Sequence, residues 1–370
     1  MNPSTCNVLV YGGGAVGAIF GWRIAQQSHA RVSVVCRSNW NVVSNHGYYL
    51  RTSTWGNGRF RPRQVFQAGA IAELTDKHRF DYIVCSNKVT DGYTSALQDL
   101  QPLVRPDTTL ISAQNGMDVE VPLRKAFPNN TVLSAICNIG CGQVRPGYIE
   151  QTAAIKRPAF LIGVHSPSSR GHNVDASRRD ALAAMDSKFA ATECITGERW
   201  RKLIFNSAWN GTCAITGLDT RQLLEYPGAA EVVIQLADEA YKVGVASGID
   251  LDPRLPMKTI ELAQDSAPIT PSTLQDARAR RPMELSPIFG ESSRTSYFTA
   301  LLTSIGYLVE QAARVGTHVP YLTWIYTLLR LRNSAYVAEQ AVVEPLQRSF
   351  AAVEELSSTI VSSGMSAEVM

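Results

Sequence analysis

The 370-residue sequence predicts an α/β amino-terminal half built on a parallel sheet, followed by an all-α carboxyl-terminal half. Up to residue 147, short apolar runs alternate with longer amphipathic stretches, which is typical of βαβ units. From Glu198 onward, apolar residues recur at helical spacing almost throughout. The chain is long enough for two domains that each bury a core. We therefore expect one domain over 1–196 and a second over 197–370.

The elements of the first half follow from apolar runs separated by polar turns. The expected strands are 8–11, 31–36, 81–86, 108–113 and 131–136, with a helix over 15–27 behind the first strand. Segments 148–152 and 159–164 are hairpin-like, and we expect them to finish the sheet with antiparallel edges. Residues 165–174 contain Pro, Ser and Gly and are predicted to form an exposed loop. A last strand is expected over 191–195.

The second half contains segments whose apolar periodicity predicts helices. These segments are 200–210, 231–246, 256–265, 301–315, 322–333 and 337–356. The tail from Ser357 is rich in serine and small residues, so we expect it to fray. No internal repeat is visible along the chain.

The composition is that of an ordinary globular protein, with 45% hydrophobic and 18% charged residues. A net charge of +3 gives no argument for nucleic acid or a membrane surface as a partner. The seven cysteines are scattered, which favours reduced thiols over a disulfide framework. Cys137 and Cys141 form the one close pair, interpreted as core residues rather than metal ligands. With no visible signal peptide or spanning segment, we expect a soluble, cytoplasmic protein.

A glycine-rich motif directly follows the first predicted strand and opens the first predicted helix. Its residues are Gly12, Gly13, Gly14, Ala15, Val16 and Gly17, which match G-x-G-x-x-G. The first glycine suits a tight turn, the second a close approach to a pyrophosphate, and the third close packing of helix on strand. The alternative is a glycine-rich turn without a ligand, but the strand–turn–helix context favours a Rossmann-type dinucleotide-binding domain.

The end of the second strand discriminates between the two nicotinamide dinucleotides. Sheets that bind NAD usually carry an Asp or Glu there, whereas this chain has Cys36, Arg37 and Ser38. A guanidinium and a hydroxyl match a 2′-phosphate in charge and geometry. The alternative is an arginine that merely ends a strand in solvent. We predict NADPH rather than NADH as the cofactor.

A polar stripe runs along an otherwise apolar helix near the start of the second half. Lys202, Asn206 and Asn210 recur at i, i+4 and i+8, so they lie on one helix face. Buried polar groups need partners, which a small polar ligand could supply. A hydrogen-bond network that serves packing is an equally good interpretation of these three residues taken alone.

The whole chain resembles the ketopantoate reductase family, the 2-dehydropantoate 2-reductases. The resemblance covers nearly the full length and depends on several motifs in order. They are the glycine motif, Lys88, Asn115-Gly116-Met117, Trp200-Arg201-Lys202-Leu203 with Asn206 and Asn210, Ser272-x-x-Gln275-Asp276, Glu284 and Gly316-x-x-Val319-Pro320. Their joint order and spacing identify the chain as a family member.

The resemblance implies a role for each matched residue. Lys202 would be the general acid that protonates the keto oxygen, and Glu284 would contact the nicotinamide side and help to position the lysine. Asn206 and Asn210 would hold the hydroxyl end of the substrate. The remaining matches are Ser272 for the substrate carboxylate, Asn115 for cofactor and substrate, Lys88 for the cofactor cleft and Gly140 for a backbone contact to the cofactor. For Asp276 we favour a structural role, holding the loop that presents Ser272.

The reaction implied is NADPH-dependent reduction of 2-dehydropantoate to (R)-pantoate, a step of pantothenate biosynthesis. Three departures touch the substrate side: residues 268–271 with Ile269 between two prolines, extra residues around 291–306, and the pair Asn138 and Cys141. They support an alternative, a paralogue that reduces another 2-oxo acid or a specialised carbonyl. A more remote alternative is a non-catalytic NADP-binding regulator. The expected partner is a small 2-oxo acid, with no nucleic acid, no membrane and no metal; a homodimer is left open.

Overall fold

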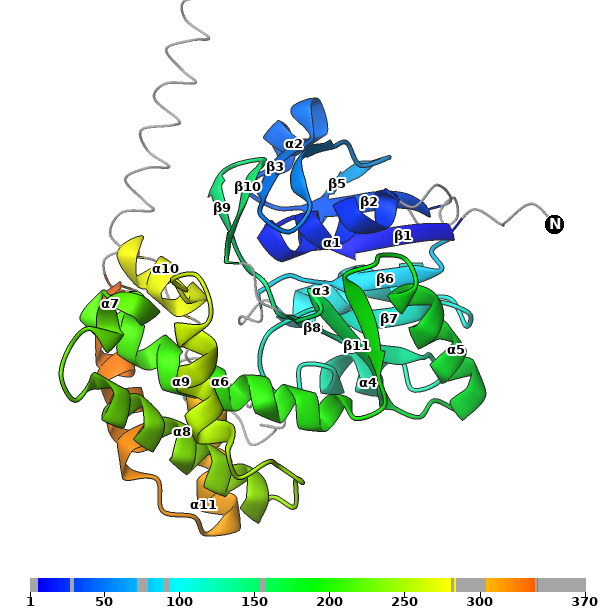
Figure 1. The fold of residues 1–370 in the computed structure, drawn as a ribbon. Coiled ribbons are helices and arrows are strands. Elements are labelled where there is room, and N and C mark those ends of the chain that lie inside the picture. Colours follow the sequence, from blue (N-terminus) through cyan, green and yellow to red (C-terminus); the bar gives the residue numbers. More distant parts are fainter. Residues whose placement is uncertain are drawn as a thin grey trace, which may run out of the picture.

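The first half of the chain contains a sheet of eight strands in the order β12-β11-β8-β7-β6-β1-β2-β5 (Figure 1). The computed structural model describes residues 6–26, 30–71, 79–88, 93–153, 157–280, 283, 304–336 and 338. The strands of this sheet are β1 (Cys6–Tyr11), β2 (Ala30–Cys36), β5 (Val65–Gln67), β6 (Tyr82–Cys85), β7 (Thr109–Ser112), β8 (Val132–Cys137), β11 (Phe160–Ser166) and β12 (Phe189–Thr192). The five strands predicted first lie within one or two residues of β1, β2, β6, β7 and β8.

The central strand β1 explains why the sheet forms where it does. Val8 and Val10 pack into one core cluster, whereas Leu9 and Tyr11 pack into another on the opposite face. A parallel strand covered on both faces is apolar along its buried part, as β1 is from Val8 to Tyr11. β1 pairs in parallel with β2 on one side and with β6 on the other. The chain therefore changes direction across the sheet at β1, and such a switch point is where this kind of fold binds its ligand.

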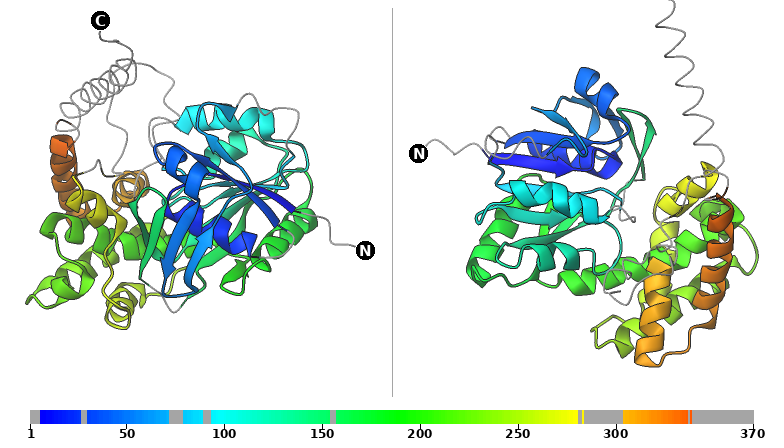
Figure 2. Two further views of the ribbon diagram at one scale, coloured as in Figure 1. Left: turned by 90° about the horizontal axis from the view of Figure 1, so that it is seen from above. Right: turned by 180° about the vertical axis from the view of Figure 1, so that it is seen from behind.

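Helices cover the two faces of the sheet and connect its strands (Figures 1 and 2). They are α1 (Ala15–Ala25), α2 (Trp40–His46), α3 (Tyr93–Leu100), the 3₁₀ turn η2 (Gln101–Leu103), α4 (Val121–Ala126) and α5 (His172–Ala183). The helix predicted over 15–27 is α1, and its carboxyl-terminal cap is Gln26.

A second sheet corrects the prediction for the hairpin-like segments. It has the order β4-β3-β10-β9, formed by β3 (Tyr48–Thr52), β4 (Gly56–Phe60), β9 (Gly140–Arg145) and β10 (Tyr148–Ala153). Segment 148–152 thus belongs to this sheet, and not to an edge of the first. β11 does pair antiparallel with β8, but β12 lies outside it, so β11 is not an edge. Local periodicity identified the strands but carries no information about which distant strand each one pairs with.

The exposed loop predicted over 165–174 is shorter in the structure, where residues 167–171 form the loop and Pro167, Ser169 and Gly171 are exposed. β11 continues to Ser166, and α5 begins at His172. The cause is Asp175, which is fully buried and accepts hydrogen bonds from Ser168 N, Ser168 Oγ and Thr131 Oγ1 at 2.7, 2.7 and 2.6 Å. Polar residues that suggest solvent exposure here satisfy one another inside the protein.

The second half is helical, as predicted. Its helices are α6 (Ile195–Thr216), α7 (Thr220–Leu224), α8 (Ala229–Ala246), α9 (Leu255–Gln264), α10 (Ser272–Arg278), α11 (Ser304–Val315) and a further helix over 320–336. α6 is much longer than the predicted 200–210, and it ends at Gly217, which has a φ of 78°. The helix expected over 337–356 and the tail from Ser357 lie outside the described residues, apart from position 338.

α6 joins the two halves (Figures 1 and 2). Its first turns contact β8 and β11 of the sheet, and the rest packs against α8, α9 and α10. Trp209, Cys213 and Ala214 on α6 are fully buried in the helical core. Side chains on the early turns of α6 therefore stand between a rigid sheet and a helical bundle. Within the part of the chain that the structure describes, no helix has the length and apolarity needed to cross a bilayer.

Candidate active site

The glycine motif forms an open cradle at the start of α1. A Cβ on Gly12, whose φ is 118°, would lie 2.4 Å from Asn87 N, and a Cβ on Gly17 would lie 2.2 Å from Gly12 O. Those two positions therefore need glycine for a tight turn and for close packing. A Cβ on Gly14 would meet no atom within 4 Å, and Gly14 caps α1 without a side-chain hydrogen bond. The space in front of Gly14 and the free N–H groups of the first helical turn suit a phosphate group.

Buried polar side chains hold the cradle from behind. Asn39 Nδ2 donates to Gly13 O at 2.7 Å, and Tyr48 Oη donates to the same oxygen at 3.0 Å. Ala15 and Val16 form the first turn of α1 beside this oxygen. The loop is thus fixed by contacts to its backbone, which leaves its outer surface available.

Arg37 and Ser38 lie directly after β2, and both are exposed. β2 neighbours β1 in the sheet, so these two side chains stand at the same edge as the cradle. A guanidinium and a hydroxyl in that place can bind the 2′-phosphate of a 2′-phosphorylated dinucleotide.

Residues that follow the other parallel strands reach the same edge. Lys88 follows β6, Asn115 follows β7, and Gly140 begins β9 just beyond β8. Because the carboxyl ends of parallel strands meet at one edge of a sheet, the topology brings these three residues, far apart in sequence, to the side that carries the cradle.

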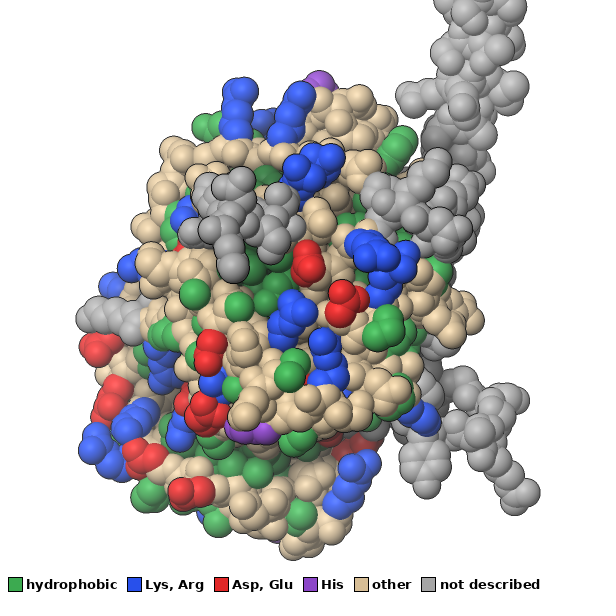
Figure 3. Space-filling view, turned by 90° about the vertical axis from the view of Figure 1, so that its right-hand side faces the viewer, with side chains coloured by type: hydrophobic (Ala, Val, Ile, Leu, Met, Phe, Trp, Pro, Cys, Tyr) green, Lys and Arg blue, Asp and Glu red, His purple; other side chains and the backbone are tan. Residues whose placement is uncertain are grey.

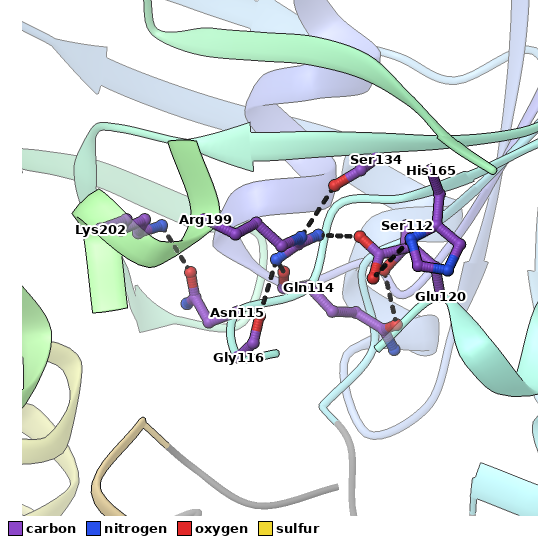
Figure 4. A network of polar contacts seen from close by, with 9 residues as sticks. All are labelled: Ser112, Gln114, Asn115, Gly116, Glu120, Ser134, His165, Arg199 and Lys202. Atoms are coloured by element: carbon purple, nitrogen blue, oxygen red, sulfur yellow. Dashed lines mark hydrogen bonds and ion pairs between the residues drawn. The ribbon is translucent and has the colours of Figure 1, made fainter. Parts of the chain in front are cut away.

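Lys202 is anchored between the sheet and α6. Its Nζ donates to Asn115 Oδ1 at 2.7 Å (Figure 4) and to the backbone oxygen of Cys137. Burial lowers the pKa of Lys202 to about 8, and the positive charge of Arg199 acts in the same direction, while the sulfurs of Cys137 and Cys141 oppose them. An amine with such a pKa holds a proton near neutral pH and gives it up readily, as a general acid requires.

A small recess opens beside this lysine. It is lined by Asn115, Gly116, Arg199, Lys202, Leu203 and Asn206. Three residues predicted as site residues, Asn115, Lys202 and Asn206, therefore come together in one hollow between the two halves. Asn210 lies one turn further along α6 and is half-buried. The recess combines an ammonium, two carboxamides and a guanidinium edge, which can bind a small anion that carries an oxo group.

Ser272 is the first residue of α10, and it is exposed. α10 packs against α6 and is also tied to the sheet half, since Lys88 Nζ lies 2.9 Å from Asp276 Oδ2. The sequence interpretation gave Lys88 and Asp276 separate roles and did not foresee this pair. It links the end of β6 to the helical half across the site.

Two predicted features fall on residues that the structure does not describe. Glu284 lies outside the described residues, as do residues 291–303 of the segment interpreted as an insertion. Ser304, Ile305 and Gly306 of that segment form the beginning of α11. Among the described residues, no group of three or more His, Cys, Asp or Glu side chains is placed to hold a metal ion.

Two family models match the chain in the order of its two halves. The model described as ketopantoate reductase PanE/ApbA matches residues 8–163, and the model described as ketopantoate reductase PanE/ApbA C terminal matches residues 194–296. Together they cover more than half of the chain.

The chain belongs to the ketopantoate reductase family.

Three individual relatives extend this match to almost the full length. The crystal structure of 2-dehydropantoate 2-reductase from Methylococcus capsulatus has 30% identity and a TM-score of 0.71, covering 89% of this chain and 97% of that one. Uncharacterized protein YDL144C of Saccharomyces cerevisiae is 24% identical, covering 94% of this chain and 99% of the relative. A ternary structure of D-mandelate dehydrogenase with NADH and anilino(oxo)acetate has 19% identity and a TM-score of 0.71, covering 89% and 99%. The last of these shows the shared fold.

Membership of the ketopantoate reductase family makes the chain an oxidoreductase with a nicotinamide cofactor. The residues present fit such a group. The open space at Gly14 and the uncapped start of α1 accept a pyrophosphate, and Arg37 and Ser38 lie where the ribose end would reach.

Sequence reasoning missed a buried ion pair behind the recess of this ketopantoate reductase relative. The guanidinium of Arg199 contacts the carboxylate of Glu120, and only 7% and 1% of these side chains are exposed. Arg199 precedes Lys202 by three residues, so helical spacing could have placed it on the lysine's face. No local signal could have named Glu120 as its partner.

Proposed function

We propose that this chain reduces the oxo group of 2-dehydropantoate to give (R)-pantoate, with NADPH as the reductant and Lys202 as the general acid. The observation that carries the proposal is the ammonium of Lys202, held at 2.7 Å from Asn115 Oδ1 in a recess that Asn206 also lines. The division of labour follows the two halves: residues 1–196 bind the cofactor, and residues 197–370 bind the substrate and supply the acid.

NADPH, when bound, supplies a hydride to the 2-keto carbon of the substrate. The ammonium of Lys202 polarises the keto oxygen and then gives it a proton, which leaves a neutral amine held by Asn115 and the Cys137 carbonyl. Asn206 and Asn210 hold the hydroxyl end of the substrate, and Ser272 receives its carboxylate. Glu284 completes the catalytic pair with Lys202 and contacts the nicotinamide side. Gly12, Gly13, Gly14, Ala15, Val16, Gly17, Arg37, Ser38, Lys88, Asn115, Gly140 and Glu284 bind the cofactor.

A substrate panel tests the proposal. We expect oxidation of NADPH that depends on 2-dehydropantoate, with a kcat/KM above that for other 2-oxo acids, because kcat/KM ratios report differential binding of the transition state. If another 2-oxo acid is preferred, the enzyme class stands and the substrate changes. If cofactor binds and no 2-oxo acid is turned over, the chain is instead an NADP-binding regulator.

A second candidate, reduction of a different 2-oxo acid, has support of its own. Ile269 is buried in the helical half, and its N–H donates to Thr220 Oγ1 at 3.0 Å. This apolar residue, held against α7, gives no polar contact to a substrate. The structural relative D-mandelate dehydrogenase was solved with an oxoacetate compound. The panel therefore includes 2-oxo acids with an aromatic group.

The rate of reduction should depend on pH through Lys202. Since the pKa of Lys202 is lowered to about 8, the ammonium is present below that pH and is lost above it. Only the protonated form can supply the proton, so kcat/KM should be level on the acidic side and fall as the pH rises through about 8. A profile of kcat/KM against pH measures this, and a level profile across that range would contradict the role of Lys202.

Arg37 should discriminate between the two cofactors. Arg37→Ala removes a charged hydrogen bond to the 2′-phosphate, which is worth about 1.5–3 kcal/mol, so KM for NADPH should rise roughly tenfold to a hundredfold. KM for NADH should change little. Arg31→Ala is the matched control, since Arg31 is an exposed arginine near the amino end of the same strand. Equal losses with both cofactors would refute the contact.

A further inference from the structure

Arg199 makes more contacts near the recess than an ion pair would need. We propose that Arg199 is a positioning residue: it holds the backbone on both sides of Asn115, and thereby sets the Asn115 carboxamide against the ammonium of Lys202. The inference rests on the proposed function, since it assigns a role in the same reaction. It adds a residue that does not touch the substrate's reacting atoms but controls two residues that do.

Arg199 binds the backbone of the loop that follows β7. Nη1 of Arg199 donates to Gln114 O at 3.2 Å and to Gly116 O at 2.8 Å (Figure 4). These two carbonyls flank Asn115 in the sequence. Gly116 has a φ of 110°, so the chain turns sharply just after Asn115. Hydrogen bonds on both sides of that turn fix where the Asn115 side chain begins.

The guanidinium of Arg199 is itself held so that it cannot rotate. Its Nε donates to Ser134 Oγ at 2.9 Å on β8, and its Nη2 contacts the buried carboxylate of Glu120. His165 on β11 lies on the far side of that carboxylate, with Nδ1 at 3.8 Å from Oε2. A planar fork held at three nitrogens is a rigid template. Arg199 therefore fixes the position of the loop relative to the central sheet.

The spacing of residues on α6 also supports a role for Arg199 in the site. Arg199 and Lys202 are three residues apart in one helix, so they share a face. The loop after β7 is therefore tied to α6 at three points: Gln114 O, Gly116 O and Asn115 Oδ1. A buried ion pair that served stability alone would need Glu120 but not the two carbonyls beside Asn115. The contacts favour a role in the site.

The positive charge of Arg199 also affects Lys202, the proposed general acid. It lowers the pKa of Lys202, whereas Cys137 on β8 and Cys141 on β9 face the lysine and act to raise its pKa. A side-chain hydrogen bond with Cys141 lowers the pKa of Cys137, and burial opposes it.

On its other side, Arg199 faces Glu120, and it also acts on Asp118. Burial raises the pKa of Asp118, followed by the charge of Glu120, while Arg199 and His165 act to lower it.

Loss of the Arg199 guanidinium removes a positive charge from the surroundings of Lys202. The fall of kcat/KM should then move to higher pH.

Arg199→Gln and Arg199→Lys in the full chain test the proposal by steady-state kinetics against pH. We expect kcat for the 2-oxo acid to fall about a hundredfold, the cost of a misplaced catalytic group, while KM for NADPH rises far less, because Asn115 is one of many cofactor contacts and the cradle at Gly14 stays in place. In Arg199→Gln, the pH at which kcat/KM falls on the basic side should rise. In Arg199→Lys, which keeps the positive charge, that pH should stay the same. Arg201→Gln is the control, because Arg201 lies on the same helix but pairs with Glu198 and not with the loop after β7. A kcat within about twofold of wild type, without a pH shift, would overturn the inference.

A second variant covers the event that Arg199→Gln does not fold, since it leaves the buried Glu120 carboxylate unpaired. Ser134→Ala keeps the ion pair and removes one anchor of the guanidinium. Its kcat should fall several-fold with a smaller change in KM for NADPH, and no change in kcat would count against the positioning role.

A readout without turnover separates this inference from the proposed function. The rate at which an amine-reactive acylating reagent labels Lys202, followed by peptide mass spectrometry against pH, reports the lysine's titration. If wild type turns over no 2-oxo acid, the proposed function fails. The Arg199 inference fails separately if the labelling profiles of wild type and Arg199→Gln coincide.

Discussion

Replacing Lys202 by alanine should lower kcat for the 2-oxo acid by roughly 10²- to 10⁴-fold, the range over which a positioned general acid contributes. Among the described residues that line the recess, no other side chain can replace this acid. Asn115 and Asn206 carry carboxamides, which do not release protons near neutral pH, and the guanidinium of Arg199 is engaged by Glu120. Steady-state kinetics with saturating NADPH measures the loss directly.

Binding of NADPH should survive this substitution, because the cradle at Gly14 lies on α1 and not on α6. Thermal shift with NADPH checks that the variant still folds and binds. Lys242→Ala is the matched control: Lys242 lies on α8, pairs with Asp238 at the surface and should leave kcat unchanged. Retention of more than about a tenth of the wild-type kcat by Lys202→Ala would contradict a general-acid role.

The second large effect is expected at Gly14. Gly14→Asp should weaken NADPH binding on the order of a hundredfold, or about 2.8 kcal/mol. The reason is that a carboxylate would enter the open space where the pyrophosphate is received. The fold should be unaffected, since no atom lies within 4 Å of that Cβ position and Asp is a good helix N-cap. Titration of intrinsic fluorescence with NADPH gives the Kd.

Two further variants separate charge from space. Gly14→Ser offers the same capping ability without charge, so its loss of affinity should be smaller. Gly17→Ala should instead destabilise the fold. Its Cβ would lie 2.2 Å from Gly12 O, so we expect a loss of about 1–3 kcal/mol in the free energy of unfolding. Thermal melts of the cofactor-free proteins measure this. Equal stabilities for the two positions would refute the assignment of glycine roles.

Several features of the fold and site were predicted from the sequence because they depend on neighbours along the chain. The glycine motif lies between a strand and a helix at the predicted positions, and the glycines divide into tight and open ones as expected. Lys202 and Asn206 share a helix face because four residues make about one turn. The alternation of Val8 and Leu9 between two cores follows from the geometry of a single strand.

The partners of these residues were decided only by the tertiary structure. Arg199 meets Gly116 across 83 residues, Lys202 meets Asn115 across 87, and Lys88 meets Asp276 across 188. Likewise, whether segment 148–152 joins the first sheet or the second depends on which strand edges remain free after the chain has folded. Periodicity and propensity report the environment of a residue but not the identity of a distant neighbour, because they arise from the local backbone repeat. The sequence by itself therefore determined the cradle and the lysine face; the folded sheet and α6 decided what holds them in place.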